Sequence, residues 1–247
     1  MAIHKLSQAF FGSLQIEWPC PACGQLTLQI KKETLHQADS YESRQLWKEE
    51  WAEPEMLSGV FCCMAECYRP QCGEVVICSG TSGNEQDREG ETGEQYYTVY
   101  KPVSFVPPLN PFKIHDNCPD EISEPLVASF SVYLAQPGSA ANLIRITVER
   151  LLTAIGVPEL NNKGRRIVLH ERLKNHLPGN YADYAGPLMA IKFLGNAGSH
   201  TYDEVKISDI EDAFEIMEYV VTDIFSGRKE SIEVLTKRLS GKFGNKE

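Results

Sequence analysis

The sequence contains no long apolar run, and positive charge is scarce in it. No window of its 247 residues approaches the ~18 consecutive apolar residues of a membrane-spanning helix. The first twelve residues carry an apolar stretch too short for a signal peptide. Lys and Arg number 24 against 34 Asp and Glu, a net charge of −10. We therefore expect a cytoplasmic protein with no membrane contact, in which any nucleic-acid contact requires a local basic patch.

Cysteine is present, and its distribution is uneven. Of eight cysteines, seven fall between Cys20 and Cys78, and Cys118 stands apart. Clustered cysteines in a chain without an export signal indicate a metal site more than disulfides. Redox chemistry is less favoured, because no βαβ pattern surrounds the Cys-x-x-Cys pair.

The metal site is predicted from two similar turns. Cys20-Pro-Ala-Cys23-Gly24 has the form of a zinc knuckle, and Cys72-Gly73 repeats its end after Cys67. The predicted ligands of one structural Zn²⁺ are Cys20, Cys23, Cys67 and Cys72. Four thiolates leave no open coordination position, so such a zinc is not catalytic. Three further cysteines remain possible substitutes, Cys63 first, then Cys62 and Cys78; otherwise Cys62 and Cys63 are expected as buried thiols.

The predicted fold class is α+β. Alternating segments at 27–30, around both knuckles and at 96–106 predict a small N-terminal β zinc ribbon over residues 1–106. An acidic insertion at 31–58 carries a predicted helix at 41–51, on which Trp47 and Trp51 are expected to pack. Residues 80–93 are predicted as a Gly-rich acidic loop. Residues 107–119 form a Pro-rich linker.

A helical bundle is predicted over residues 120–247. Ser123 and Pro125 predict one helix start, and Ser139 predicts another after Pro137-Gly138. The helix that follows Ser139 is predicted at 140–155, and further helices are predicted at 167–177 and 181–194. A basic patch at 163–166 lies between the first two of these three. The series 208–211 reads as a capping box opening a helix at 209–225, and a short basic helix follows at 229–239.

One stretch of this half combines a cation, an amide and an imidazole. Lys192, Asn196 and His200 fall within nine residues, and Gly195-Asn196 is typical of a helix C-terminus. The expectation is that the helix ends there and that His200 lies in the following loop. A histidine can take and return a proton near neutral pH, and a lysine can neutralise a phosphate. The alternative is an ordinary helix stop followed by a hydrogen-bonded loop histidine.

Two motifs carry a family resemblance. Residues 141–152 contain Arg145 and Glu149 in an Arg-x3-Glu helix, and residues 194–200 read Leu-Gly-Asn-Ala-Gly-Ser-His, a Gly-Asn-x3-His signature. Together they resemble the family called domain of unknown function 4145, over about 124–225. The cysteine pairs look like the zinc module often joined to it.

This family is grouped with the HEPN superfamily of helical domains in prokaryotic toxins, restriction and antiviral defence. The resemblance implies a homodimer through the helical domain and a metal-independent ribonuclease site for RNA at the dimer contact. His200 would be the acid or base, Asn196 would orient it or the ligand, and Lys192 would supply the cation. Arg145 and Glu149 would face this site, or form an ion pair within the bundle.

The cation departs from the HEPN motif. Lys192 stands where an arginine is usual, eight residues before His200, and a lysine cannot grip a phosphate bidentately. The competing hypothesis is therefore a non-catalytic dimeric adaptor in a defence or restriction complex, whose zinc module docks a protein partner. A DNA-binding regulator is a third, weaker hypothesis, because the zinc half lacks clustered Lys and Arg.

Overall fold

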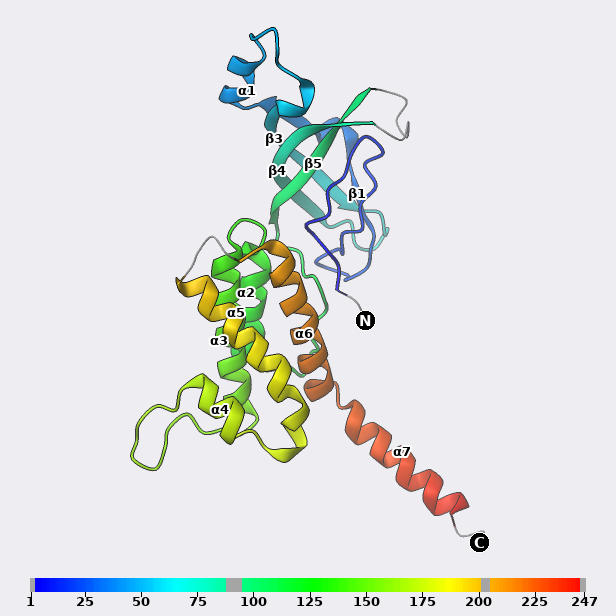
Figure 1. Ribbon diagram of the computed structural model, residues 1–247. Coiled ribbons are helices and arrows are strands. Elements are labelled where there is room, and N and C mark those ends of the chain that lie inside the picture. Colours follow the sequence, from blue (N-terminus) through cyan, green and yellow to red (C-terminus); the bar gives the residue numbers. More distant parts are fainter. Residues whose placement is uncertain (1–2, 88–94, 201–204, 245–247) are drawn as a thin grey trace.

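The chain folds into an N-terminal antiparallel sheet followed by a C-terminal helical region, an α+β arrangement (Figure 1). A computed structural model describes residues 3–87, 95–200 and 205–244, except the side chains of His200 and Glu230. Within these residues, no helix is long and apolar enough to cross a membrane.

The sheet is a curled antiparallel meander. Strand β1 (Leu28–Ile30) pairs with β3 (Ser58–Cys67), β3 with β4 (Val75–Gln86), and β4 with β5 (Tyr96–Val106). Strand β2 (His36–Asp39) pairs with an earlier part of β3, on the same edge as β1. Buried and exposed residues alternate along β3, as expected for a strand with one face in a core. The strand predicted at 96–106 is confirmed.

The predicted loop at 80–93 is partly wrong, because β4 continues to Gln86. Gly80 sits at a β-bulge with Ser79, and a Cβ there would lie 2.0 Å from the Lys101 carbonyl oxygen and 2.7 Å from the Phe61 ring. The glycine therefore permits a close approach between β4 and its neighbours. It does not mark a loop.

Residues 31–58 form β2, two 3-10 turns (Lys32–Thr34 and Pro54–Met56) and helix α1 (Tyr41–Leu46). The helix is shorter than predicted, and the expected packing of its tryptophans is wrong. Trp47 and Trp51 are 59% and 62% exposed, since the chain turns away after Leu46. The only buried residue of α1 is Ser43, whose hydroxyl donates to the Ser58 carbonyl and ties the helix to β3.

The first residues of the described chain connect sheet and helices. Phe10 is buried among the rings of Trp18, Phe61 and Tyr100, and it forms a β-bridge with Tyr100. The His4 N–H donates to the Pro111 carbonyl at 2.7 Å. The Ser7 hydroxyl donates to a carboxylate oxygen of Glu211, a buried residue of the helical region, at 2.6 Å.

The helical region begins at the predicted residue 120, but its first helix starts earlier than Ser123 and Pro125 predict. Helix α2 (Asp120–Val132) starts after Pro119, whose carbonyl accepts from the N–H groups of Ile122 and Ser123. Ser123 is therefore not its cap, and Pro125 lies inside the helix. Helix α3 (Pro137–Ala154) starts at Pro137, not after Ser139, because a proline suits the first helical position. It ends as predicted before Gly156, which has a φ of 85°.

The remaining helices complete this region. They are α4 (Leu169–Asn175), a 3-10 helix (Gly179–Tyr184), α5 (Ala185–His200), α6 (Ile207–Phe225) and α7 (Arg228–Phe243). Helix α6 begins at Ile207, two residues before the prediction, and the Asp209 carboxylate accepts from the Lys206 N–H at 2.8 Å. Helices α2, α3, α5 and α6 pack around a shared core, whereas α7 extends away from them (Figure 1).

Candidate functional sites: a four-cysteine cluster and a cationic pocket

The four predicted metal ligands lie together at one end of the sheet. Their sulfur atoms all lie within 4.8 Å of one another. Cys20 Sγ is 3.6 Å from Cys72 Sγ, and Cys23 Sγ is 3.9 Å from Cys67 Sγ. The cluster is thus close enough to hold one metal ion.

Two similar turns present these sulfurs. The Gly24 N–H donates to the Cys20 carbonyl at 2.8 Å, and the Gly73 N–H donates to the Arg69 carbonyl at 3.2 Å. Gly24 and Gly73 have φ values of 69° and 60°, the left-handed region that glycine adopts without strain. The sequence repeat of Cys followed by Gly therefore reflects a structural repeat.

The surroundings of the cluster favour a thiolate at Cys23 but not at Cys20. The Gln25 backbone N–H, followed by Thr27 and Arg69, lowers the pKa of Cys23 to about 6. Burial instead raises the pKa of Cys20 to about 12. The buried Thr27 hydroxyl lies 3.0 Å from Cys67 Sγ. Since a metal binds the deprotonated sulfur, these donors and Arg69 reduce the cost of gathering negative charge.

The other cysteines lie outside the cluster. Cys63 and Cys78 are buried opposite each other on β3 and β4, so Cys63 does not replace a predicted ligand within the described structure. Cys62 is exposed, so its expected burial is wrong, because adjacent strand residues face opposite sides. Cys118 is buried just before α2.

A second site is a cavity of about 480 Å³ between α3, α4 and α5. Its lining includes Arg145 and Glu149 of α3 and Lys192 and Asn196 of α5. The structure thus brings four of the five predicted catalytic residues to one pocket. Helix α5 contains His200 as its last residue, but that side chain lies outside the described structure.

The pocket is cationic, and a network orders its charges. Arg145 Nη2 and Arg166 Nη2 each lie 3.0 Å from one carboxylate oxygen of Glu149. Lys192 lies elsewhere on the lining, with its ammonium 4.4 Å from the centre of the Phe193 ring. The lining carries four cationic side chains (Arg145, Arg166, Arg172 and Lys192) and two carboxylates (Glu149 and Glu159). Its formal net charge is therefore +2.

The comparisons with known proteins cover both halves of the chain. Residues 8–106 match a domain of unknown function, DUF8608, and residues 128–242 match another, DUF4145. Residues 128–242 belong to the DUF4145 family. No curated protein and no solved structure matches the chain.

In the DUF4145 domain, the signature at 194–200 is helical, so the predicted helix stop is wrong. Helix α5 runs through Gly195 and Gly198 because both face α3. A Cβ on Gly195 would lie 2.6 Å from the Arg145 Cβ, and one on Gly198 would lie 2.5 Å from the Gly138 carbonyl oxygen. The glycines allow close helix packing, and Lys192 and Asn196 of this helix line one cavity with Arg145. The backbone of His200 follows Asn196 by four residues, one helical turn.

His170 and Arg172 are among the pocket residues that were not predicted as site residues from the sequence. His170, on the first turn of α4, lines the same cavity. Arg172 is 4% exposed and donates to the Glu149 and Val157 carbonyls at 3.1 and 3.0 Å, and to the Thr153 hydroxyl at 2.9 Å. It fastens α4, and therefore His170, to the end of α3. The basic patch at 163–166 was the feature of the sequence that could have indicated this part of the pocket, because it directly precedes α4.

Proposed function

We propose that the DUF4145 domain is a HEPN-like, metal-independent endoribonuclease whose cationic pocket binds the RNA phosphate backbone. The observation that supports this is the convergence of Arg145, Lys192 and Asn196 on a cavity that also carries Arg166, Arg172 and His170. The chain has a net charge of −10, which repels phosphate groups overall. The lining of this pocket has a charge of +2 and thus provides the local positive charge that a phosphate ligand requires.

In the proposed reaction, side chains of the protein supply the base, the acid and the cations, and no metal ion takes part. His200 accepts the proton of a ribose 2′-hydroxyl, and the 2′-oxygen attacks the adjacent phosphorus. The bond from phosphorus to the 5′-oxygen breaks, and that oxygen takes a proton from His170. Lys192 and Arg145 neutralise the charge that builds on the phosphate, and Asn196 orients it. The products are a 2′,3′-cyclic phosphate and a 5′-hydroxyl.

The cysteine cluster is proposed to hold a structural Zn²⁺. Tetrahedral zinc with Zn–S bonds of about 2.3 Å sets its sulfurs about 3.8 Å apart. The 3.6 and 3.9 Å separations within the cluster fit that spacing. Four thiolates would close the coordination shell, so this zinc would stabilise the turns of the sheet and take no part in RNA cleavage.

Cleavage of labelled RNA in EDTA tests the ribonuclease. Wild-type protein is expected to yield fragments with cyclic phosphate ends, and His200→Ala or His170→Ala to lower the rate at least ~100-fold, the range of a lost acid or base. His36→Ala, at an exposed position on β2, is the matched control and should cleave normally. Equal cleavage by His200→Ala and the control would reject the proposed role of His200.

The alternative is a non-catalytic dimeric adaptor of a defence complex, with the zinc module docking a partner. The observation that favours it is the exposure of large apolar side chains in two parts of the chain. Trp47 and Trp51 are exposed near α1, and α7 exposes Ile232, Val234, Leu235, Leu239 and Phe243. If wild type cleaves no RNA while light scattering gives twice the monomer mass, and Leu235→Asp restores the monomer, the adaptor is favoured.

A further inference from the structure

The free edge of β1 is the starting point. Tyr68 N–H donates to the Thr27 carbonyl, and Lys31 N–H donates to the Met64 carbonyl, at 3.0 and 2.8 Å. In an antiparallel pair, residues whose peptide groups face the partner alternate with residues whose groups face away. Thr27, Gln29 and Lys31 therefore face β3. The N–H and C=O groups of Leu28 and Ile30 point in the opposite direction.

These outward groups have no partner in the part of the chain that the structure describes. No strand, β-bridge or backbone hydrogen bond of the described residues joins Leu28 or Ile30 on that side. Leu28 is only 4% exposed as a whole residue, and Ile30 is half-buried. Buried peptide groups are nearly always paired, and an unpaired strand edge is a template for another strand.

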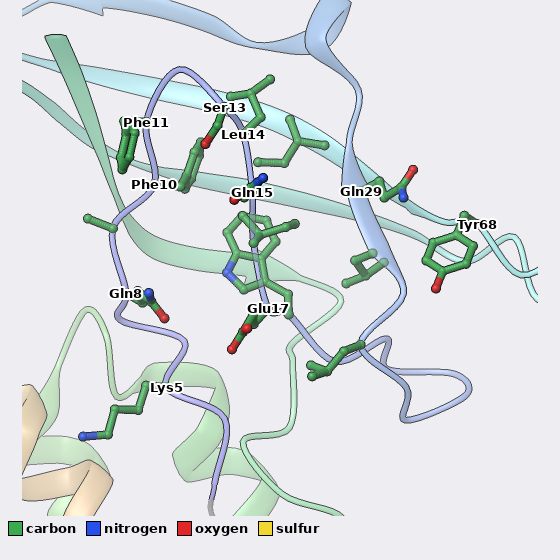
Figure 2. Close-up of a pocket in the computed structure, with 16 residues that line it drawn as sticks. Lys5, Gln8, Phe10, Phe11, Ser13, Leu14, Gln15, Glu17, Gln29 and Tyr68 are labelled. Carbon is green, nitrogen blue, oxygen red and sulfur yellow. The ribbon is translucent and has the colours of Figure 1, made fainter. Parts of the chain in front are cut away.

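A cavity lies along this edge. It measures about 760 Å³ and is bounded by β1 and by the N-terminal segment 8–18. Figure 2 shows the segment through Phe11, Leu14 and Gln15 on one side and the strand carrying Gln29 on the other. Leu28 and Ile30 thus line an open volume that the rest of the described chain does not fill.

We propose that this pocket binds an extended peptide segment of a partner protein, which adds to β1 as a further strand. The partner's backbone pairs with the N–H and C=O groups of Leu28 and Ile30, a spacing of two residues that matches one repeat of a strand. The inference does not rest on the proposed ribonuclease, whose pocket lies in the helical region.

The lining indicates the kind of segment. Among the described residues that line it, only Lys5 and Glu17 are charged. Their signs are opposite, so a charged peptide gains nothing from the lining. Gln8, Gln15 and Gln29 offer amides that both donate and accept. Phe11 and Leu14 offer apolar contacts. The fitting segment is uncharged, with Ser, Thr, Asn or Gln alternating with β-branched residues.

A nucleic acid strand fits this pocket poorly. One lysine cannot neutralise successive phosphates, and the neighbouring Glu17 repels them. A peptide instead brings the donors and acceptors that the edge of β1 lacks. For the same reason, the main-chain groups are expected to supply most of the affinity.

The test uses the full-length protein and a displayed library of random uncharged ten-residue peptides. Selected peptides are expected to slow amide hydrogen exchange at Leu28 and Ile30 at least tenfold. Replacing Ile30 by proline removes an N–H that faces the pocket and leaves the N–H groups that face β3, so Ile30→Pro should weaken binding at least tenfold. Ile30→Val, which keeps the N–H, is the matched control and should bind as wild type does.

A second measurement keeps the test decisive if Ile30→Pro fails to fold. N-methylating alternate residues of a selected peptide removes the N–H groups on one of its edges. One of the two alternating patterns should weaken binding to wild type at least tenfold, and the other should have little effect. The proposal is overturned if no peptide is selected, or if both methylated forms bind equally with the Leu28 and Ile30 amides unprotected.

Discussion

Gly195 of α5 lies directly against Arg145 of α3, so that a Cβ on the glycine would come within 2.6 Å of the Arg145 Cβ and 2.9 Å of its Cδ. One contact thus links the Gly-Asn signature of the DUF4145 domain to its Arg-x3-Glu helix. The close approach brings the side chains of both helices to the cationic pocket.

Substituting Gly195 by alanine is expected to destabilise the protein. An alanine in a helix normally gains roughly 0.5–1 kcal/mol over glycine, but here its methyl group must push α5 from α3, at about 1–3 kcal/mol. The net result should be a lower melting temperature, followed by circular dichroism.

Gly241→Ala is the matched control for this experiment. Gly241 also lies inside a helix, α7, and an added Cβ there meets nothing within 4 Å. It should leave the melting temperature unchanged or slightly raised. A Gly195→Ala protein as stable as wild type would mean that the helices separate without cost.

The comparison of Gly195 with the cysteines shows what the sequence could predict. The four-cysteine cluster was predictable because each turn is local and its ligands follow the short spacing of a knuckle. The helical course of 194–200 was not, because Gly-Asn is also the ordinary signal of a helix end. Only the position of α3 shows that these glycines are contact residues.

The same distinction applies to Gly80 and His170. Gly80 sits in a sequence that predicts a loop, yet the approach of Lys101 from β5 makes a glycine necessary inside a strand. His170 carries no motif, and it joins the pocket only through the packing of α4 on α3. The strand at 96–106 and the helix end before Gly156 depend on nearby residues and were predicted.

Metal content should depend on the clustered cysteines. Purified protein is expected to carry about one equivalent of zinc, and Cys20→Ser or Cys67→Ser to lose it, because three thiolates bind the ion far more weakly. The loss should also lower the melting temperature. Elemental analysis by mass spectrometry measures the metal directly.

Cys62→Ser provides the control for the metal experiment. Cys62 is on β3, as Cys67 is, but it is exposed and outside the cluster. This variant should retain its zinc and its stability. Full zinc retention in Cys67→Ser would remove that residue from the ligand set.

Arg172 is expected to be a major support of the cationic pocket. Arg172→Leu removes the donors to the carbonyls of Glu149 and Val157 and leaves both without that partner. Each such loss costs about 1–3 kcal/mol, so the two together are expected to cost about 2–6 kcal/mol in urea unfolding. Lys174→Leu, at an exposed position of the same helix, should change stability little. If the two variants unfold at similar urea concentrations, the position of α4 does not depend on Arg172.

The attachment of α7 is expected to weaken in acid. Lys229 Nζ lies 2.7 Å from the Asp223 carboxylate and 2.9 Å from the Tyr184 hydroxyl, which itself donates to Asp223. Lys229, and then Tyr184, holds the pKa of Asp223 below its usual value. A carboxyl with a lowered pKa stabilises the fold at pH values above its unfolded pKa, and this stabilisation is lost as the pH falls through the folded value.

Hydrogen exchange of the α7 amides measures this attachment. Exchange in the first turn of α7, relative to an unstructured reference peptide at the same pH, should accelerate below about pH 4, the range of an unperturbed aspartate. Asp223→Asn should show the fast exchange already at neutral pH, with a loss of about 1 kcal/mol because Lys229 is half-exposed. Lys237→Met, further along α7 and exposed, should exchange as wild type does. If Asp223→Asn exchanges like wild type at neutral pH, the ion pair does not hold the helix, and the short segment 226–227 alone sets its position.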